Sequence, residues 1–415
     1  VRRLSRHPSL VVWCGNNEVG WGDAEWGYRQ KRPVTPHHAL FHLYIPRILD
    51  AEDPSKVYWP SSPWSPDFGP PNDPTMGDQH PWGVSILEPG PADFWKYRGH
   101  VDRFPNEGGV LGASLPVTLD DFLPEGERTL LSPSWVHHDN PIAYRGAKAG
   151  DLGRVYETFR FWTGLDPLEM DYRDYALLSG LLQAEGLTEY IANYRRRMFS
   201  SASAVFWMYN DSWPATHGWT IVDYYLRRRL SYHPVRRAFQ PVTVVVADEG
   251  AAIGVYGVND TPIAWNGDLR YGLFDVAGGY PVDRSMGVVI PPLESTRLTE
   301  IPRSEWDRVG HSRTGAFAVL MRDAETVAVH RLLLARFSDL AFVDCPIHVA
   351  RSEASAVFTC DAFAWGVCID LVGSQAVADN CFDLLPGIGY TVPWSNHDEP
   401  PQVRFVGSQA LVAQR

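Results

Sequence analysis

The chain has 415 residues, of which 45% are hydrophobic and 21% are charged, and its formal net charge is −12 at pH 7. This length exceeds the ~250–300 residues at which a single core usually stops growing, so we expect two or three domains. The negative charge offers no cationic surface for a phosphate backbone or an anionic membrane, and no apolar run is long enough to span a bilayer. We therefore expect neither nucleic acid nor a membrane as a partner.

Aromatic residues are abundant, with 16 Trp, 18 Tyr and 18 Phe. Flat apolar rings suit large cores and also the faces of sugars, so a carbohydrate ligand is a first hypothesis. The five cysteines have spacings that match no metal template, and we interpret them as small buried hydrophobic residues. The sequence predicts no cofactor and no metal, and it leaves the localisation open.

Up to about residue 240, short apolar runs alternate with helical patterns. Strands are predicted at 10–14, 57–61, 103–113 and 204–209. Helices are predicted over 37–49, 151–162 and 172–198, where apolar residues recur three and four positions apart. This alternation indicates parallel βα units, and the Pro-rich loop at 59–82 follows a strand end, where an α/β barrel carries its functional loops.

After Pro241 the helical periodicity disappears, and short alternating segments are separated by Gly, Asp, Asn and Pro. Such spacing is typical of a β-sandwich, which we predict over 241–337. A second, smaller sandwich is predicted over 338–415, and we include the stretch QVRFVGSQALVA near the C-terminus among its strand-forming segments.

Two glutamates follow an apolar run and an asparagine: Glu18 in WCGNNE and Glu107 in RFPNE. Glycoside hydrolysis needs two carboxylates that flank one bond, and a barrel can supply them from different strand ends. The separation of 107 − 18 = 89 residues fits three further βα units. A glutamate at a strand end is more often solvated or salt-bridged than catalytic, so the residues alone leave both interpretations open.

The segment HPSLVVWCGNNE resembles the acid/base motif of glycoside hydrolase family 2, and its WCGNNE wording is closest to the β-mannosidase branch. The resemblance continues in order through VYWPSSPW, GDQHPW, RFPNEGG, AVFWMYNDSWP and VADNCFDLLPG. It implies a retaining exo-β-glycosidase that hydrolyses a terminal β-linked hexose, mannose first, by double displacement. Glu18 is then expected to be the general acid/base and Glu107 the nucleophile.

The resemblance also implies a set of sugar-binding residues, which are Asn17, Trp26, His80, Trp82 and Trp207. Asn17 is expected to touch the 2-hydroxyl, Trp207 to form a floor under the ring, and Trp82 to form an aromatic wall. Trp26 is expected to line the same subsite, although Trp21 competes for that role. The structural alternative for each is a core tryptophan or a histidine in a structural hydrogen bond.

One departure from the family pattern affects the sugar. The nucleophile strand of mannosidases usually reads R-F-x-S-E-Y/F-G, whereas RFPNEGG has Asn106 and Gly108. Gly108 opens space beside the reacting sugar, so a β-glucosaminidase or β-galactosidase remains an alternative.

A second departure from the family pattern concerns how much of the family's domain architecture the chain contains. The family carries a jelly roll, an immunoglobulin-like domain and half a barrel before the acid/base strand, and this chain opens with Val1 directly ahead of that strand. The resemblance thus implies α/β plus all-β architecture: the second half of a (β/α)8 TIM barrel over 1–240, followed by two immunoglobulin-like β-sandwiches. We expect the chain alone to be inactive until the missing N-terminal half of the same protein covers its open edges. A non-catalytic carbohydrate-binding or scaffold protein is the alternative.

Overall fold

The computed structural model describes residues 1–31, 36–66, 69–144, 152–395 and 399–414. They divide into two compact units. The first unit comprises Val1–Trp82, Val101–Gly108 and Ser200–Phe206, and the second comprises Gly83–His100, Gly109–Phe199 and Trp207–Arg415. The domain boundaries predicted after residues 240 and 337 stay predictions.

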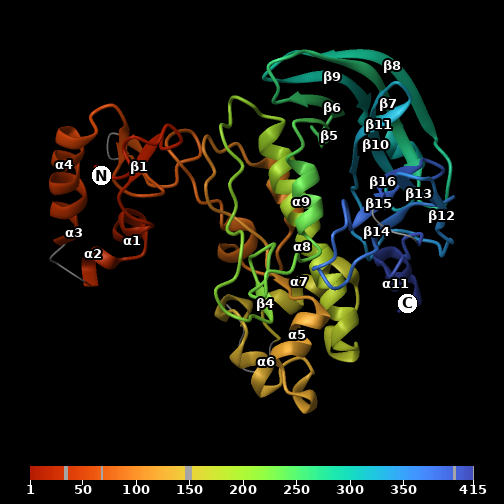
Figure 1. The fold of residues 1–415 in the computed structure, drawn as a ribbon, viewed down its shortest axis with the longest axis horizontal. Coiled ribbons are helices and arrows are strands. Elements are labelled where there is room, and N and C mark those ends of the chain that lie inside the picture. Colours follow the sequence, from red (N-terminus) through yellow and green to blue (C-terminus); the bar gives the residue numbers. More distant parts are fainter. Residues whose placement is uncertain (32–35, 67–68, 145–151, 396–398, 415) are drawn as a thin grey trace. The chain divides into compact units, whose positions relative to one another are not determined.

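A short parallel sheet organises the first unit. β1 (Val12–Cys14) pairs with β2 (Val57–Trp59). The chain between them forms α1 (Val19–Glu25), α2 (Tyr28–Lys31), α3 (Pro36–Ala39), a π-helical turn (Leu40–Tyr44) and α4 (Ile45–Glu52) (Figure 1). Parallel neighbours need such a crossover connection. The strands and the helix predicted for this region are confirmed, although both strands are shorter than expected.

Of the other two strands predicted before residue 240, the one at 103–113 is wrong in extent and the one at 204–209 is wrong. In the segment 103–113, one parallel bridge joins Pro105 to Gln79, and only β3 (Gly112–Ala113) is a strand, paired antiparallel with β4 (His217–Gly218). The segment 204–209 contains no strand. Its backbone N–H groups donate to separate segments, Val205 to Pro105 O at 3.2 Å and Met208 to Trp219 O at 3.1 Å, so no continuous ladder forms. The observed class is mixed α/β followed by β-sandwich sheets, and the half-barrel stays a prediction.

The longest helix of the second unit is α8 (Tyr172–Arg195), and most of its residues are buried. A helix with apolar residues on every side belongs inside a core. The side chain of Asp171 caps its first turn by accepting from Arg173 N–H at 2.8 Å. The surrounding helices are α5 (Pro116–Phe122), α6 (Pro133–His137), α7 (Arg154–Thr163) and α9 (Tyr232–Ala238), with short turns at Gly83–Leu87, Phe94–Gly99, Glu125–Glu127, Pro141–Tyr144 and Pro167–Glu169.

Helices α7 and α8 confirm the patterns predicted at 151–162 and 172–198, for the residues that the structure describes. Among these residues, no helix combines the length and the apolar character that crossing a membrane would require.

The first sandwich consists of two antiparallel sheets, with strand orders β11-β10-β7-β8 and β5-β6-β9. The strands are β5 (Val242–Asp248), β6 (Ala252–Asn259), β7 (Trp265–Asp275), β8 (Val282–Ile290), β9 (Glu294–Pro302), β10 (Thr314–Arg322) and β11 (Glu325–Leu332). Inward-facing residues of both sheets share one apolar core, which includes Val255, Leu269 and Leu320. The helix α10 (Arg303–Val309) adds Trp306 to this core and was not predicted.

The second sandwich has the strand orders β12-β13-β16 and β15-β14-β17. Its strands are β12 (His348–Arg351), β13 (Ser355–Thr359), β14 (Ala364–Cys368), β15 (Phe382–Leu384), β16 (Tyr390–Pro393) and β17 (Phe405–Val406). Including QVRFVGSQALVA among the strand-forming segments is mostly wrong, because Gly407–Ala413 forms the helix α11. Gly366 has a φ of +68°, and a Cβ there would lie 2.5 Å from Leu181 of α8, so the sandwich approaches that helix closely.

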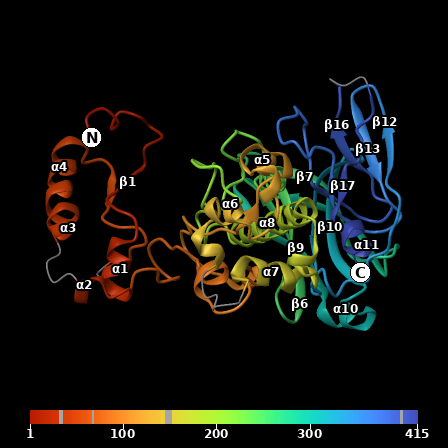
Figure 2. The same cartoon turned by 90° about the horizontal axis from the view of Figure 1, so that it is seen from below.

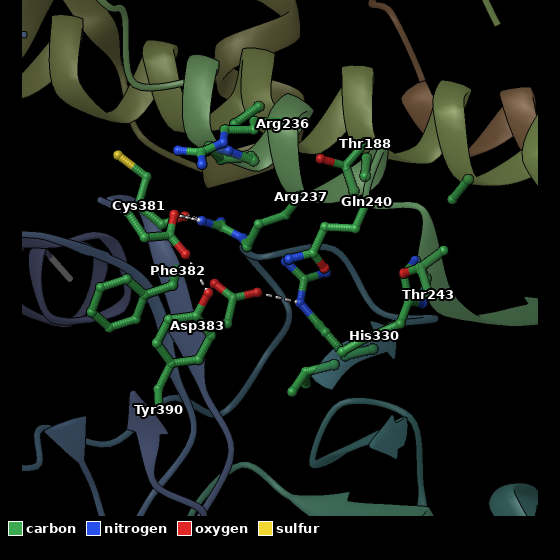
Figure 3. Close-up of a pocket in the computed structure, with 18 of the residues that line it drawn as sticks. Thr188, Arg236, Arg237, Gln240, Thr243, His330, Cys381, Phe382, Asp383 and Tyr390 are labelled. Atoms are coloured by element: carbon green, nitrogen blue, oxygen red, sulfur yellow. Dashed lines mark hydrogen bonds and ion pairs between the residues drawn. The ribbon is translucent and has the colours of Figure 1, made fainter. Parts of the chain in front are cut away.

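A cavity of about 630 Å³ lies where α8 and α9 meet strands of both sandwiches (Figure 3). Figures 1 and 2 both show the two sandwiches on the same side of α8. Arg331 on β11 donates to both carboxylate oxygens of Glu185 on α8 at 2.8 and 2.7 Å, and to Asp383 on β15 at 2.8 Å. Nearby, burial lowers the pKa of His330 to about 4, so this imidazole is neutral at pH 7. One guanidinium therefore ties the helix to both sandwiches.

Replacing Arg331 by Ala should destabilise the protein by about 3–5 kcal/mol, because the buried carboxylate of Glu185 and the partly buried carboxylate of Asp383 lose their counter-charge. The measurement is chemical denaturation followed by tryptophan fluorescence. Arg284→Ala is the matched control, since Arg284 also forms a two-oxygen contact with one glutamate, Glu305, at 3.1 and 2.8 Å, but its side chain is 40% exposed. The control should cost no more than about 1 kcal/mol. Equal losses of stability in the two variants would show that Arg331 does not stabilise the contact between α8 and the two sandwiches.

Candidate active site

The backbone after β1 continues the parallel pairing beyond the sheet. Gly15 N–H donates to Trp59 O at 2.8 Å, Ser62 N–H to Asn16 O at 2.9 Å, and Glu18 N–H to Ser62 O at 2.7 Å. Glu18 directly precedes α1 as its N-cap residue and lies in the left-handed region, with a φ of 60°. Such a backbone is uncommon outside glycine, and it persists where surrounding contacts hold it. The strand end thus fixes the position from which the Glu18 side chain projects.

The carboxylates of Glu18 and Glu107 both lie close to the imidazole of His80. His80 Nδ1 lies 2.9 Å from Glu18 Oε1 and 3.4 Å from Glu107 Oε2, and the three ligand atoms all lie within 4.8 Å of one another. The His80 side chain is 1% exposed, whereas those of Glu18 and Glu107 are 23% and 14% exposed. Two carboxylates that solvent and a small ligand can reach therefore share one buried histidine.

A hydrogen-bond network behind His80 fixes where its protons lie. Asp78 accepts four hydrogen bonds, from Trp59 Nε1 at 2.7 Å, Trp64 N–H at 2.7 Å, Ser62 Oγ at 2.5 Å and Asn106 Nδ2 at 2.9 Å. Because the Ser62 hydroxyl proton points to Asp78, Ser62 Oγ accepts from His80 Nε2 at 3.0 Å.

With Nε2 protonated, Nδ1 of a neutral His80 has only a lone pair to offer two carboxylate oxygens. The contacts to Glu18 and Glu107 are then attractive only when one further proton lies on Nδ1 or on a carboxyl group. The geometry therefore allows the three groups to share one proton, which is what an acid paired with a nucleophile requires.

Glu107 also accepts a hydrogen bond from Trp82 Nε1 at 3.1 Å. Burial raises the pKa of the Glu107 carboxyl group, and the charge of Glu18 raises it further, while His80 and the Trp82 hydrogen bond oppose this shift. The indole and the imidazole are accordingly the groups that favour an ionised Glu107.

One tryptophan of α1, Trp21, lies beside His80, and Trp26, just after the helix, packs on it. Trp21 is 4% exposed, and its ring centroid lies 6.3 Å from that of His80. Trp26 packs on Trp21 with centroids 5.0 Å apart and is 37% exposed. Trp21 is thus the buried ring beside His80, and Trp26 is the more exposed of the two rings. Asn17 is exposed beside Glu18, and its backbone bridges to Ser62.

Of the residues predicted for the site, Asn17, Glu18, Trp26, His80, Trp82 and Glu107 belong to the first unit. Trp207 belongs to the second unit and is 42% exposed, so its place under the sugar stays a prediction. Sequence reasoning missed Ser62 and Asp78. The signal for Asp78 was its position two residues before His80 in GDQHPW, which places both on one side of an extended segment.

Three comparisons place the chain among known proteins. Residues 251–337 match the family described as Mannosidase Ig/CBM-like domain. The chain is 31% identical over 266 residues to β-mannosidase B of Aspergillus niger and 28% identical over 270 residues to that of Thermothelomyces thermophilus. The crystal structure of β-D-mannosidase from Dictyoglomus thermophilum matches 94% of the chain with a TM-score of 0.83 and 25% identity.

The chain is a relative of the β-mannosidases of glycoside hydrolase family 2. The alignments cover 60% of this chain and 30% of the Aspergillus niger protein, and 59% and 29% for the Thermothelomyces thermophilus protein. The structural match covers 46% of the Dictyoglomus thermophilum chain. The exo-chitosanase of Amycolatopsis orientalis, at 16% identity and a TM-score of 0.63 over 94% of this chain and 49% of its own, shares the fold. This β-mannosidase relative thus spans less than half the length of each of these proteins.

The raised pKa of Glu107 makes its ionisation unfavourable for folding. A carboxyl whose folded pKa is raised contributes fully to stability below its unfolded pKa, near 4.5, and loses that contribution as the pH rises through the folded value. Glu107→Gln should therefore raise the thermal midpoint at pH 7, with the gain disappearing below about pH 4. Thermal unfolding of both proteins between pH 3.5 and 8 measures this difference. A gain in the thermal midpoint that persists unchanged at pH 3.5 would show that it does not come from a raised pKa of Glu107.

Proposed function

We propose that this protein, completed by the rest of its polypeptide, is a retaining exo-β-glycosidase in which Glu18 is the acid/base and Glu107 is the nucleophile. The observation that carries the proposal is the approach of both carboxylates to His80 Nδ1, with their oxygens within 4.8 Å. Carboxyl groups about 5–5.5 Å apart suit direct attack on the sugar, whereas inverting enzymes keep roughly 6.5–9.5 Å for a water.

The reaction proceeds in two displacements. Glu18 donates its proton to the glycosidic oxygen while Glu107 attacks the anomeric carbon, so the bond to the leaving group breaks as a glycosyl ester forms. Glu18, now ionised, takes a proton from water, and the hydroxide oxygen displaces Glu107 from the anomeric carbon. Two inversions give net retention. His80 and Trp82 act as positioning residues that stabilise the negative charge on Glu107 before attack and after its release.

The proposed substrate is a terminal β-mannoside, because the aligned relatives are named β-mannosidases. A β-glucosaminide is the second candidate, since the fold is shared with an exo-chitosanase that has been crystallised with PNP-β-D-glucosamine. Gly108 in place of an aromatic residue favours keeping that candidate. A non-catalytic carbohydrate-binding protein would have no use for a proton shared between two reachable carboxylates.

Removal of each glutamate should have a different stereochemical result in the active protein that contains this chain. Glu107→Ala should remove nearly all turnover, and azide entering the vacated face should give an inverted glycosyl azide. Glu18→Ala should still form the ester from aryl glycosides with good leaving groups, and azide should then give a retained product. NMR of the products distinguishes the two anomers.

Residual activity above about a tenth of wild type in Glu107→Ala would exclude it as the nucleophile. Glu88 would then be the next residue to replace, although its carboxylate is 2.5 Å from Lys96 Nζ.

Substrate preference is tested by ranking kcat/KM on aryl β-mannoside, β-glucosaminide, β-galactoside and β-glucoside with the same leaving group. The mannoside should rank first. A shared leaving group makes the sugar the only variable, so the ratios report differential binding of the transition state. A mannoside that ranks last would overturn the mannosidase proposal while leaving the two-glutamate mechanism intact.

A further inference from the structure

A second cluster of ligand-type side chains lies in the first unit, at the motif HHALFH, which the proposed reaction does not use. Asp23 on α1 has a side chain that is 5% exposed, and its Oδ2 faces two histidines of α3. His37 Nε2 lies 2.8 Å from this oxygen, and His38 Nε2 lies 3.3 Å from it. The two ring nitrogens and the carboxylate oxygen all lie within 4.8 Å of one another.

These separations are close to those of a metal site. Tetrahedral zinc binds His nitrogen and Asp oxygen at about 2.0–2.2 Å, which sets neighbouring ligand atoms about 3.3–3.5 Å apart. The 3.3 Å between His38 Nε2 and Asp23 Oδ2 already has this value. The 2.8 Å between His37 Nε2 and Asp23 Oδ2 would have to increase by about 0.5 Å. A rotation about side-chain torsions is sufficient for that change, because the His37 side chain is 28% exposed.

We propose that Asp23, His37 and His38 bind one Zn²⁺ ion, with solvent as the fourth ligand. Two imidazoles and one carboxylate suit zinc and its neighbours in the first transition series, whereas Mg²⁺ and Ca²⁺ prefer sites built from oxygen. No metal was expected from the sequence, because zinc sites are usually recognised by cysteine pairs or by histidines at a fixed spacing. Here the third ligand comes from a different helix.

The surroundings hold the ligands in this arrangement. The ring of His42 stacks on His38 with centroids 5.2 Å apart and an interplanar angle of 29°, and it also lies 5.3 Å from the ring of Trp64. The stacking restrains the plane of the His38 imidazole, as neighbouring groups commonly do for metal ligands. Asp23 is held by α1, whose first residue follows Glu18.

A bound ion would join α3 to the helix that begins beside the proposed acid/base. Trp21 lies two residues before Asp23 on α1 and packs near His80, so the same helix carries a metal ligand and a wall of the candidate site. The expected role of the metal is structural, since it would favour the folded first unit over the unfolded chain by mass action.

The test uses the 415-residue chain without a histidine tag, stripped by a chelator and titrated with ZnCl₂ in competition with a chromophoric chelator. One equivalent should bind, and excess Mg²⁺ should not displace it. Asp23→Asn, His37→Gln and His38→Gln should each weaken binding at least about tenfold, and Co²⁺ should give visible absorption typical of four-coordinate sites in the wild type only. His38→Gln should leave the fold intact, because the His38 side chain is 44% exposed. Loss of zinc binding in this variant therefore reports on the site and not on unfolding.

Two control variants separate this site from other histidine–carboxylate contacts. His311 lies 2.9 Å from Asp307 without a third ligand, so His311→Gln should leave zinc binding unchanged. His80→Gln removes the histidine of the other three-residue group, Glu18, His80 and Glu107, and should also leave it unchanged. The proposal is overturned if no equivalent binds, if His80→Gln abolishes binding, or if the Asp23, His37 and His38 variants bind zinc as the wild type does.

Discussion

The candidate site depends on one buried imidazole that lies between two carboxylates. Like charges at this distance repel each other, and burial adds to the cost of charge at Glu107, so a counter-charge or a shared proton beside the two carboxylates is stabilising. His80 supplies the place for that proton. Its orientation depends in turn on Ser62 and Asp78, because Ser62 Oγ accepts from Nε2 only while its own proton points to Asp78. The chemistry proposed for the two glutamates thus rests on a network whose other members never touch the sugar.

The network can form because four chain segments pair through their backbones, two by two. The end of β1 pairs with the end of β2 through backbone hydrogen bonds, and Gln79 bridges to Pro105. Each segment contributes a functional side chain just beyond its paired residues, as parallel strands do at their carboxyl ends. Asn106 stands where the family pattern has serine, and its amide donates to both Ser62 Oγ and Asp78 Oδ2 at 2.9 Å. Asn106 is therefore part of the hydrogen-bond network behind His80.

Local patterns in the sequence predicted much of the fold. Apolar periodicity identified α7 and α8, and alternation with turn residues identified most strands of both sandwiches, because these signals lie within one element. The errors lie where partners are remote. Residues 204–209 look like a strand, but their N–H groups bond to two separate segments, and Gly407–Ala413 forms a helix although its apolar residues continue a strand-like run. Glu18 and Glu107 were assigned their roles through the family resemblance. Asp78 had only its position two residues before His80 as a signal, and Ser62 had none, since serine is common in loops.

The two ligand-type clusters of the first unit differ in which cation they suit. Glu18, His80 and Glu107 bring two carboxylates to one histidine, while Asp23, His37 and His38 bring two histidines to one carboxylate. A dication at the first cluster would occupy the oxygens that must donate a proton and attack carbon, and would leave neither free to react. At the second cluster, the two neutral imidazoles add no charge, and the single negative charge of Asp23 compensates half of the charge of a Zn²⁺ ion. We therefore assign a shared proton to the cluster of Glu18, His80 and Glu107 and a metal ion to the cluster of Asp23, His37 and His38. With this assignment, the ion does not block the two carboxylates proposed to react.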